Sequence, residues 1–183
     1  ITDKEIHFFK GTDVPMPSIF EISNSGMCNR KCSFCPRSDP DYKHVNEFIS
    51  PELHKKIYSE LSIHEYSGSI IYSGFVEPLL DKKIYNQIRD IREKLPKANI
   101  ELITNGDPLN KARVEKLFDA GLSYLLVSAY DSEEQANSYR EMLRQTNVDQ
   151  SKYIVRNRYY GEDKDFGITI TNRAGNLDNT VYK

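Results

Sequence analysis

Three cysteines fall within one eight-residue stretch of this 183-residue chain, and the chain has no others. Cys28, Cys32 and Cys35 follow the pattern CxxxCxxC. A loop with this spacing can present three thiolates to one iron–sulfur cluster and leave the fourth iron without a protein ligand. Because an open iron can bind a substrate or cofactor, the triplet favours catalysis over electron storage. A zinc site completed by His44 is the alternative, although zinc sites usually pair ligands in two CxxC knuckles, and the sequence holds no second knuckle.

Composition and charge limit the classes of protein to which the chain can belong. Its length suffices for one domain with a sizeable core, with 28% charged and 38% hydrophobic residues. A net charge of −2 gives no strong field toward nucleic acid or an anionic membrane, and the apolar runs are too short to span a bilayer. No signal-peptide pattern is evident, and a clustered, odd set of cysteines suits a metal site in a reducing compartment. The sequence therefore predicts a cytoplasmic protein that binds neither nucleic acid nor membrane.

Four helices are expected from caps and from the spacing of apolar residues. Ser50 should cap the first, which begins at Pro51 and buries one face. The expected buried positions, helix by helix, are Leu53, Ile57 and Leu61; Ile84, Ile88, Ile91 and Leu95; and Val114, Leu117 and Phe118, with Gly121 ending the third helix. Asp131 or Ser132 should cap the fourth. The four histidines are expected on the surface.

Short β-branched and apolar runs alternate with these helices. Strands are expected at residues 19–23, 69–72, 99–104, 124–128, 153–156 and 167–171. Repeated strand–helix units imply a parallel sheet with right-handed crossovers. The sequence therefore predicts an α/β fold with a mainly parallel sheet, and six such units can curl into a partial barrel.

Unusual loop sequences follow the predicted strands. They are the cysteine loop and residues 74–78, 104–107, 128–131 and 172–176. Ligands bind at the C-terminal ends of parallel strands, and all five loops fall on that rim. Independent turns would not need to gather on one side, so this arrangement favours a composite active site.

The loops together resemble those of the radical S-adenosylmethionine (radical SAM) superfamily. The cysteine motif has the aromatic Phe34 directly before Cys35, and the segment Ser-Gly-Phe-Val-Glu-Pro at residues 73–78 is similar to the family's Gly-Gly-Glu-Pro segment. The segments Thr104–Gly106, Ser128–Asp131 and Asn172–Gly175 resemble the corresponding loops of the branch that often carries a C-terminal SPASM extension. The resemblance implies a partial (β/α)6 TIM-like barrel.

What this resemblance implies is radical chemistry. A 4Fe–4S cluster would bind the amino and carboxylate groups of S-adenosylmethionine (SAM) at its open iron. One electron would then cleave SAM to methionine and a 5′-deoxyadenosyl radical, which abstracts hydrogen from a peptide or small organic substrate. A low-potential donor such as flavodoxin or ferredoxin would supply the electron. Two alternatives stay open: a cluster- and SAM-binding module without turnover, and a zinc-stabilised structural domain.

The resemblance also implies which residues hold SAM. Carbonyls around Gly74 and the Glu77 carboxylate would accept the methionyl ammonium. Arg140 would bind the methionyl carboxylate, with Arg156 as a second candidate, because a guanidinium binds carboxylates bidentately. The remaining expected cofactor contacts are Ser128 at the ribose or methionyl part, Phe34 and Ala174 at the adenine, and Asn105 and Asn172 on the same rim.

Each assignment has a simpler alternative. Gly74 could only end a strand, Glu77 could be a solvated acid, and Arg140 could pair with Glu133 or Glu134 on a helix surface.

The expected boundaries follow from the same resemblance. Residues 1–18 form a lead-in, 19–175 the radical SAM core and 176–183 a tail or truncated linker. The chain departs from its relatives at Phe75 and Val76, where they often have glycines. It also lacks the cysteines of a SPASM extension, so it is expected to be either a minimal enzyme or the core of a longer one.

Overall fold

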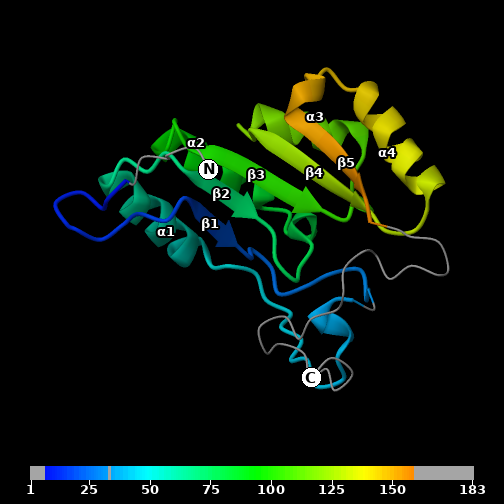
Figure 1. Ribbon diagram of the computed structural model, residues 1–183, viewed down its shortest axis with the longest axis horizontal. Coiled ribbons are helices and arrows are strands. Elements are labelled where there is room, and N and C mark those ends of the chain that lie inside the picture. The colour runs from blue at the N-terminus through cyan, green and yellow to red at the C-terminus, as the bar shows by residue number, and fades with distance from the viewer. Residues whose placement is uncertain (1–6, 33, 159–183) are drawn as a thin grey trace.

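The protein is described by a computed structural model that covers residues 7–32 and 34–158. In Figure 1, five strands form one sheet in which each strand pairs in parallel with the next one along the chain. The strands are β1 Ile19–Ile22, β2 Ser69–Tyr72, β3 Asn99–Thr104, β4 Tyr124–Ala129 and β5 Tyr153–Asn157. The helices between them are α1 Pro51–Ile63, α2 Ile84–Lys94, α3 Lys111–Asp119 and α4 Glu133–Arg144. This in-order parallel arrangement is that of an open (β/α) barrel.

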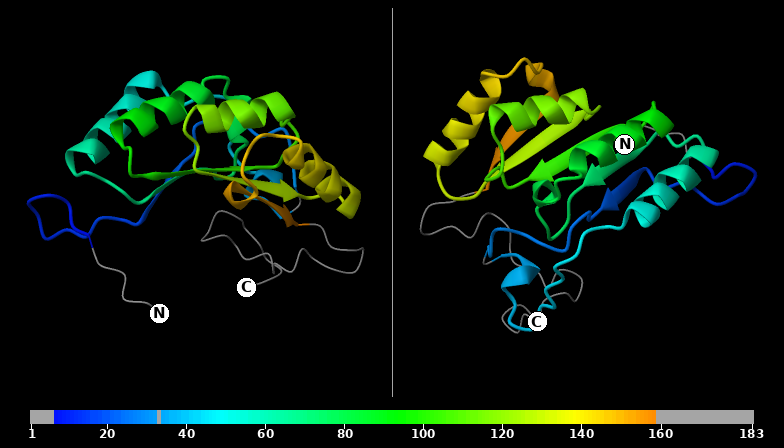
Figure 2. Two further views of the ribbon diagram at one scale, coloured as in Figure 1. Left: turned by 90° about the horizontal axis from the view of Figure 1, so that it is seen from above. Right: turned by 180° about the vertical axis from the view of Figure 1, so that it is seen from behind.

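The helices α1 to α4 all cover the same face of the sheet (Figure 2, left). Strand residues of that face, such as Ile70, Ile100 and Leu125, are fully buried, as are Ile88 of α2 and Leu117 of α3. Each such side chain contributes roughly 1.5–3 kcal/mol by leaving water. The core therefore lies between sheet and helices, and no described helix covers the opposite face of the sheet.

Side-chain caps fix where three of the helices begin. Ser50 Oγ accepts from the Leu53 backbone N–H at 3.1 Å at the start of α1, and Asn110 Oδ1 does the same for α3. Ser132, rather than Asp131, caps α4, because its Oγ accepts from Gln135 N at 3.2 Å. Such a cap is typically worth about 1 kcal/mol.

The predicted α/β fold is confirmed. Strands β2 and β3 have the expected bounds, and β1, β4 and β5 differ from expectation by one residue at their ends. The expected sixth strand at 167–171 lies outside the described residues. Residues 1–6 of the lead-in and the 176–183 tail also lie outside them.

One face of α1 differs from the prediction. Leu53, expected to be buried, is 51% exposed, whereas the neighbouring His54 is only 3% exposed. The His54 Nε2 atom lies 2.9 Å from the Tyr72 hydroxyl, beneath the helix. The expectation that all four histidines lie on the surface is therefore wrong. The inward positions of α1 run through His54, Ile57 and Leu61, a spacing of three and four that matches a helical face.

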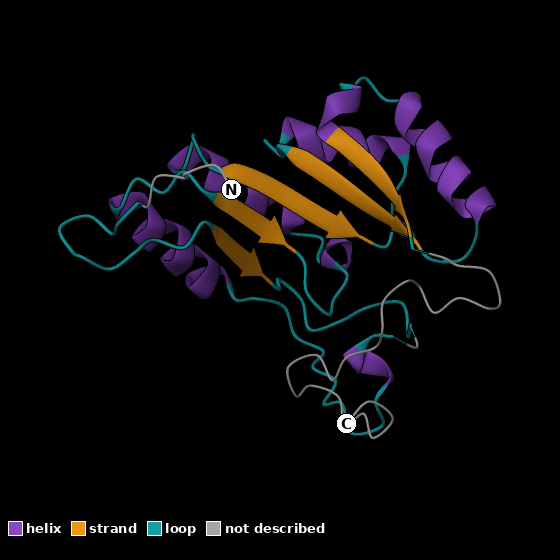
Figure 3. Ribbon diagram, viewed as in Figure 1, coloured by secondary structure: helices purple, strands orange, loops and turns teal. Residues whose placement is uncertain are grey.

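The long connection between β1 and α1 leaves the sheet at its C-terminal edge (Figure 3). It passes through the cysteines and the short helical turn Pro36–Ser38, and then returns beside its own beginning. Gly26 N donates to Glu47 O at 2.8 Å, and Ile49 N donates to Asn24 O at 2.9 Å. The cysteine loop is thus closed at its base by backbone hydrogen bonds.

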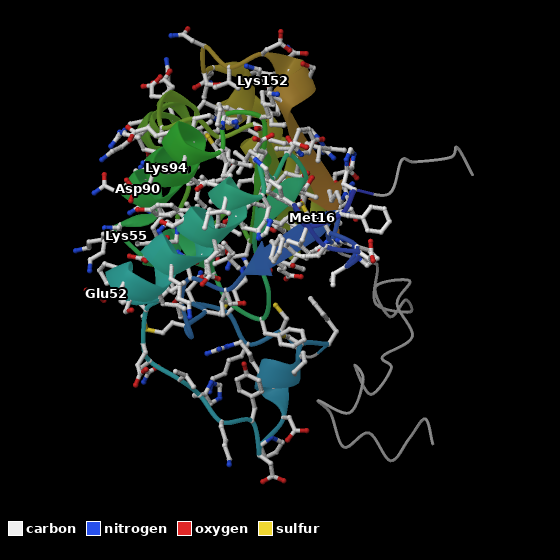
Figure 4. All side chains as sticks on the ribbon, turned by 90° about the vertical axis from the view of Figure 1, so that its left-hand side faces the viewer. Met16, Glu52, Lys55, Asp90, Lys94 and Lys152 are labelled. Carbon is white, nitrogen blue, oxygen red and sulfur yellow. The ribbon has the colours of Figure 1, made fainter. Side chains whose placement is uncertain are left out.

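The outer surface of the helical layer is strongly charged. Figure 4 shows Glu52 and Lys55 of α1 and Asp90 and Lys94 of α2 pointing away from the sheet. In the described part of the chain, no helix has the length and apolar character needed to cross a bilayer.

Candidate active site

The cysteine loop stands directly beyond the C-terminal end of β1. Cys28, Cys32 and Cys35 are all free and half-buried, and Cys35 N donates to Cys32 O at 2.9 Å in a tight turn. Burial raises the pKa of the Cys28 thiol and raises that of Cys32 to about 11. Burial therefore favours the neutral thiols, and a bound metal cation would reverse that preference because it stabilises thiolates.

The surroundings of Cys28 suit a ligand of an iron–sulfur cluster. Its sulfur accepts from Arg30 N at 3.4 Å and from Asn105 Nδ2 at 3.8 Å, and hydrogen bonds to sulfur are one of the protein's means of tuning a cluster. In the described residues, no three His, Cys, Asp or Glu side chains converge as a single metal ion requires. The three ligands of a 4Fe–4S cluster each bind a different iron, so they need not converge on one point.

His44, the histidine considered for a zinc site, is engaged elsewhere. Its Nδ1 lies 3.1 Å from Arg37 Nη2. The Arg37 side chain, 6% exposed, also donates from Nη1 to Gly26 O at 2.8 Å and to Phe75 O at 3.3 Å. Arg37 thus joins the cysteine loop to the loop after β2 and brings a positive charge close to the thiols.

Arg30 joins the cysteine loop to two further rim loops. Its guanidinium binds Asp107, after β3, and also binds Asp131, after β4, with Nη1 donating to Oδ1 at 2.6 Å. The Arg30 side chain is only 17% exposed. Hydrogen bonds from Arg30 hold the pKa of the Asp131 carboxyl below its usual range. The Asp131 carboxylate is therefore a charged acceptor at neutral pH. One guanidinium ties three loops together.

Glu77, the acid of the loop after β2, is 1% exposed. Its Oε1 accepts from Leu79 N at 3.1 Å and from the Thr104 hydroxyl at 2.8 Å, and its Oε2 accepts from Asn105 N at 2.8 Å. Burial raises the pKa of this carboxyl, partly offset by these hydrogen bonds. Glu77 is thus not a solvated acid, which was the simpler alternative. Its hydrogen bonds hold the loop after β2 against the end of β3 and the loop that follows it.

Gly74 occupies a position that requires glycine. Its φ of 115° lies in the left-handed region, and a Cβ there would collide with Ser23 Oγ. The bulky Phe75 and Val76 that follow line an open cavity of about 330 Å³ with Ser23 and Gly26. The departure from glycine at these two positions is therefore accommodated in space.

An aromatic contact links the cysteine loop to the end of β4. The rings of Phe34 and Tyr130 lie 5.4 Å apart, and the Arg30 guanidinium lies 5.7 Å from the centre of the Tyr130 ring. Ser128, 2% exposed, hydrogen-bonds the Tyr130 side chain, whose pKa is raised by burial. Phe34 and Ser128, both expected at the cofactor, are thus connected through Tyr130.

The two candidate carboxylate-binding arginines lie at the far side of the rim. Arg140 of α4 donates to Asn137 Oδ1 at 2.8 Å and to Asn157 Oδ1, at the end of β5, at 2.6 Å. Its described partners are thus amides rather than Glu133 or Glu134. Arg156 of β5 is exposed and pairs in register with Ser128. Asn172 and Ala174 lie outside the described residues.

Several residues that organise the site were not singled out from the sequence: Glu21, Arg30, Arg37, Asp107, Tyr130 and Tyr139. The role of Arg30 could have been inferred from the sequence. It is a cation inside the cysteine loop, and acids follow two of the predicted strands. Tyr139 carried no such signal, although its hydroxyl donates to Asp107 Oδ1 at 3.1 Å.

Comparison with known proteins defines the class. The model of the radical SAM superfamily matches residues 22–158, so this chain belongs to that superfamily. Enzymes of this family use a 4Fe–4S cluster and SAM. The three free cysteines of the rim loop fit such a cluster.

The most similar relatives include enzymes that act on small molecules. The chain is 29% identical over 163 residues to the S-adenosyl-L-methionine-dependent 2-deoxy-scyllo-inosamine dehydrogenase of Niallia circulans, covering 88% of this chain and 61% of that enzyme. It is 33% identical over 109 residues to a probable GTP 3′,8-cyclase of Methanococcus maripaludis, covering 60% and 35% of the two chains. The solved structure of BtrN in complex with AdoMet and 2-DOIA superposes with a TM-score of 0.73 at 25% identity, covering 89% of this chain and 63% of that one. The chain thus spans less than two thirds of the length of these relatives.

Proposed function

We propose that this protein is a radical SAM enzyme that cleaves SAM to methionine and a 5′-deoxyadenosyl radical, which then abstracts a hydrogen atom from a small organic substrate. The observation that carries the proposal is the joining of four rim loops around the cysteines. Arg30 binds Asp107 and Asp131, and Glu77 N donates to Met27 O at 2.8 Å. A rim built in this way holds a ligand at the C-terminal ends of the strands.

In this proposal Cys28, Cys32 and Cys35 hold a 4Fe–4S cluster, which supplies the electron for SAM cleavage. Gly74, whose backbone is free of side-chain bulk, offers carbonyl acceptors to the methionyl ammonium. Arg140, and Arg156 as a second candidate, bind the methionyl carboxylate. Ser128 contacts the ribose or methionyl part, and the backbones of Phe34 and Ala174 hold the adenine.

Other expected residues act through their neighbours. The Asn105 amide donates to Cys28 Sγ and to Asn29 Oδ1 at 2.8 Å, so it positions the cysteine loop. The carboxylate of Glu77, which already accepts three hydrogen bonds, fixes the loop whose carbonyls face SAM in this proposal. Asn172, which lies outside the described residues, is proposed as a further cofactor contact.

The relatives' names favour a small molecule over a peptide as substrate, since they include an inosamine and GTP. A low-potential flavodoxin or ferredoxin is proposed as the electron donor. We place the protein in the cytoplasm, because a reducing compartment keeps free thiols and clusters intact.

Anaerobic reconstitution with iron and sulfide tests the function. Wild-type protein should bind close to four irons and form 5′-deoxyadenosine from SAM under dithionite, measured by chromatography. Cys32→Ala should lose the cluster, and Lys31→Ala, an exposed neighbour in the same loop, should keep it. Stoichiometric zinc without iron uptake would refute the cluster, and a protein that binds SAM without cleaving it would be a binding module.

A further inference from the structure

One face of the sheet has no described helix packed on it, and it carries charge. Strand residues alternate between the two faces, and the register aligns Glu21 of β1, Ile71 of β2 and Glu101 of β3 on the side away from the helices. On this side Ile19 is 54% and Ile154 is 40% exposed. Figure 2 shows that the helices lie only on the other side.

The Glu21 carboxylate is held in a fixed orientation on this face. The Ser73 hydroxyl, on a residue 8% exposed, donates to Glu21 Oε1 at 2.6 Å. The Ser23 hydroxyl in turn donates to Ser73 O at 3.0 Å. No described residue donates a hydrogen bond to Glu21 Oε2, so one oxygen is anchored and the other is open to a ligand.

Among the described residues, Glu21 also has no cation paired with it. None of the ion pairs in the described part of the chain includes it, although it is exposed beside the candidate site. A Cβ on Gly74 would lie 3.7 Å from Glu21 Oε1, so the carboxylate adjoins the loop assigned to SAM. Glu77, the other acid beside that loop, already accepts three hydrogen bonds and is buried. Glu21 is therefore the carboxylate at this edge that can receive a charged donor.

We propose that Glu21 determines substrate specificity by binding a protonated amine, so that the substrate is a small molecule carrying an ammonium group. This inference rests on the proposed function, which places the substrate on the open face next to SAM. A hydroxyl could donate to the same oxygen, but a charge-assisted hydrogen bond is about twice as strong as a neutral one. A substrate that covers this face also removes water from Glu21, which strengthens the attraction to a cation further.

The test compares an amine with its neutral counterpart. The probes are 2-deoxy-scyllo-inosamine and its N-acetyl derivative, titrated calorimetrically into anaerobically reconstituted protein with saturating SAM. Wild-type protein should prefer the amine. Glu21→Gln should weaken amine binding roughly tenfold and leave the N-acetyl probe unchanged, because only the charged hydrogen bond is lost. Glu21→Asp should recover part of the preference, and Glu52→Gln, on the outer surface of α1, should behave as wild type.

Each other outcome overturns the inference. A wild-type protein without preference for the amine, including one that binds neither probe, contradicts it, as does equal weakening of both probes in Glu21→Gln. Weaker SAM binding in Glu21→Gln, with amine binding intact, would assign the ammonium to the cofactor instead. Failure of the proposed function is separately visible, since wild-type protein would then form no 5′-deoxyadenosine with or without a probe.

Discussion

Arg30 binds Asp107 through two parallel hydrogen bonds, with Nε donating to Oδ2 at 2.6 Å and Nη2 donating to Oδ1. This fork-to-carboxylate geometry is specific to arginine, and the same guanidinium reaches Asp131. The bridge fixes the middle of the cysteine loop to the rim.

Replacing Arg30 should therefore loosen the loop. In metal-free protein, Arg30→Ala should increase the rate of maleimide labelling of the cysteines several-fold, since about 1 kcal/mol of half-buried hydrogen bonding is lost. Arg30→Lys should have an intermediate rate, because an ammonium keeps the charge without the fork. Labelling at a fixed pH, with Lys31→Ala as the matched control, makes the comparison. Equal rates in all four proteins would show that the bridge does not restrain the loop.

Removing the Glu77 carboxylate should destabilise the protein. Glu77→Ala leaves two backbone N–H groups and the Thr104 hydroxyl buried without their acceptor, which should cost about 3 kcal/mol in the free energy of unfolding. Urea unfolding gives the value. As a control, Glu60→Ala removes only an exposed partner of Lys56 and should change stability by less than about 0.5 kcal/mol. A Glu77→Ala protein as stable as wild type would contradict the structural role.

The SAM-binding role of Arg140 predicts a selective loss. Arg140→Ala should retain its iron content and weaken SAM binding by about tenfold, because a charge-assisted contact to the methionyl carboxylate disappears. Arg144→Ala lies one turn further along α4, pairs only with the exposed Glu141 in the described part and serves as control. Unchanged SAM affinity in Arg140→Ala would shift the assignment to Arg156.

The buried His54 predicts a loss of stability in acid. Burial lowers the pKa of His54, although the nearby charges of Asp90 and Asp81 oppose the shift. Below about pH 6.5 the unfolded chain takes up a proton that the native state resists, so the free energy of unfolding should fall as pH falls. Above that pH, both states hold a neutral imidazole and the effect vanishes.

Thermal unfolding between pH 7.5 and 5.5 measures this dependence, since roughly one pKa unit corresponds to 1.4 kcal/mol. His54→Gln keeps a hydrogen-bonding group near Tyr72 and removes the titration, so its curve should be flatter than that of wild type. His7→Gln, which replaces an exposed histidine, is the matched control. Identical slopes in wild type and His54→Gln would contradict the burial argument.

Local patterns sufficed to predict the five described strands of the sheet. The run at 99–104 alternates outward and inward residues and ends before the turn residues Asn105-Gly106. The sequence therefore indicated where this strand begins and ends. The clustering of rim loops followed from parallel strands alone, since their C-terminal ends share one edge.

The cross-links between the loops could not be predicted in the same way. Arg30 meets Asp107 and Asp131 across 77 and 101 residues of chain, and such pairings depend on side-chain geometry that no local pattern encodes. His54 was missed for a different reason, because apolar spacing gave the helical face to Leu53. A polar residue can occupy a buried position when a partner such as Tyr72 satisfies it.

The order of the rim loops along the chain also has a consequence during synthesis. The cysteines leave the ribosome first, yet Arg30 acquires its anchors only after 77 and then 101 further residues have been made. The strands pair strictly in the order of translation, so the sheet can grow as the chain emerges. The backbone hydrogen bonds at the base of the cysteine loop, by contrast, join residues that are all made before β2. The Arg30 anchors of the cysteine loop are therefore complete only once the nascent chain has made its fourth strand and Asp131.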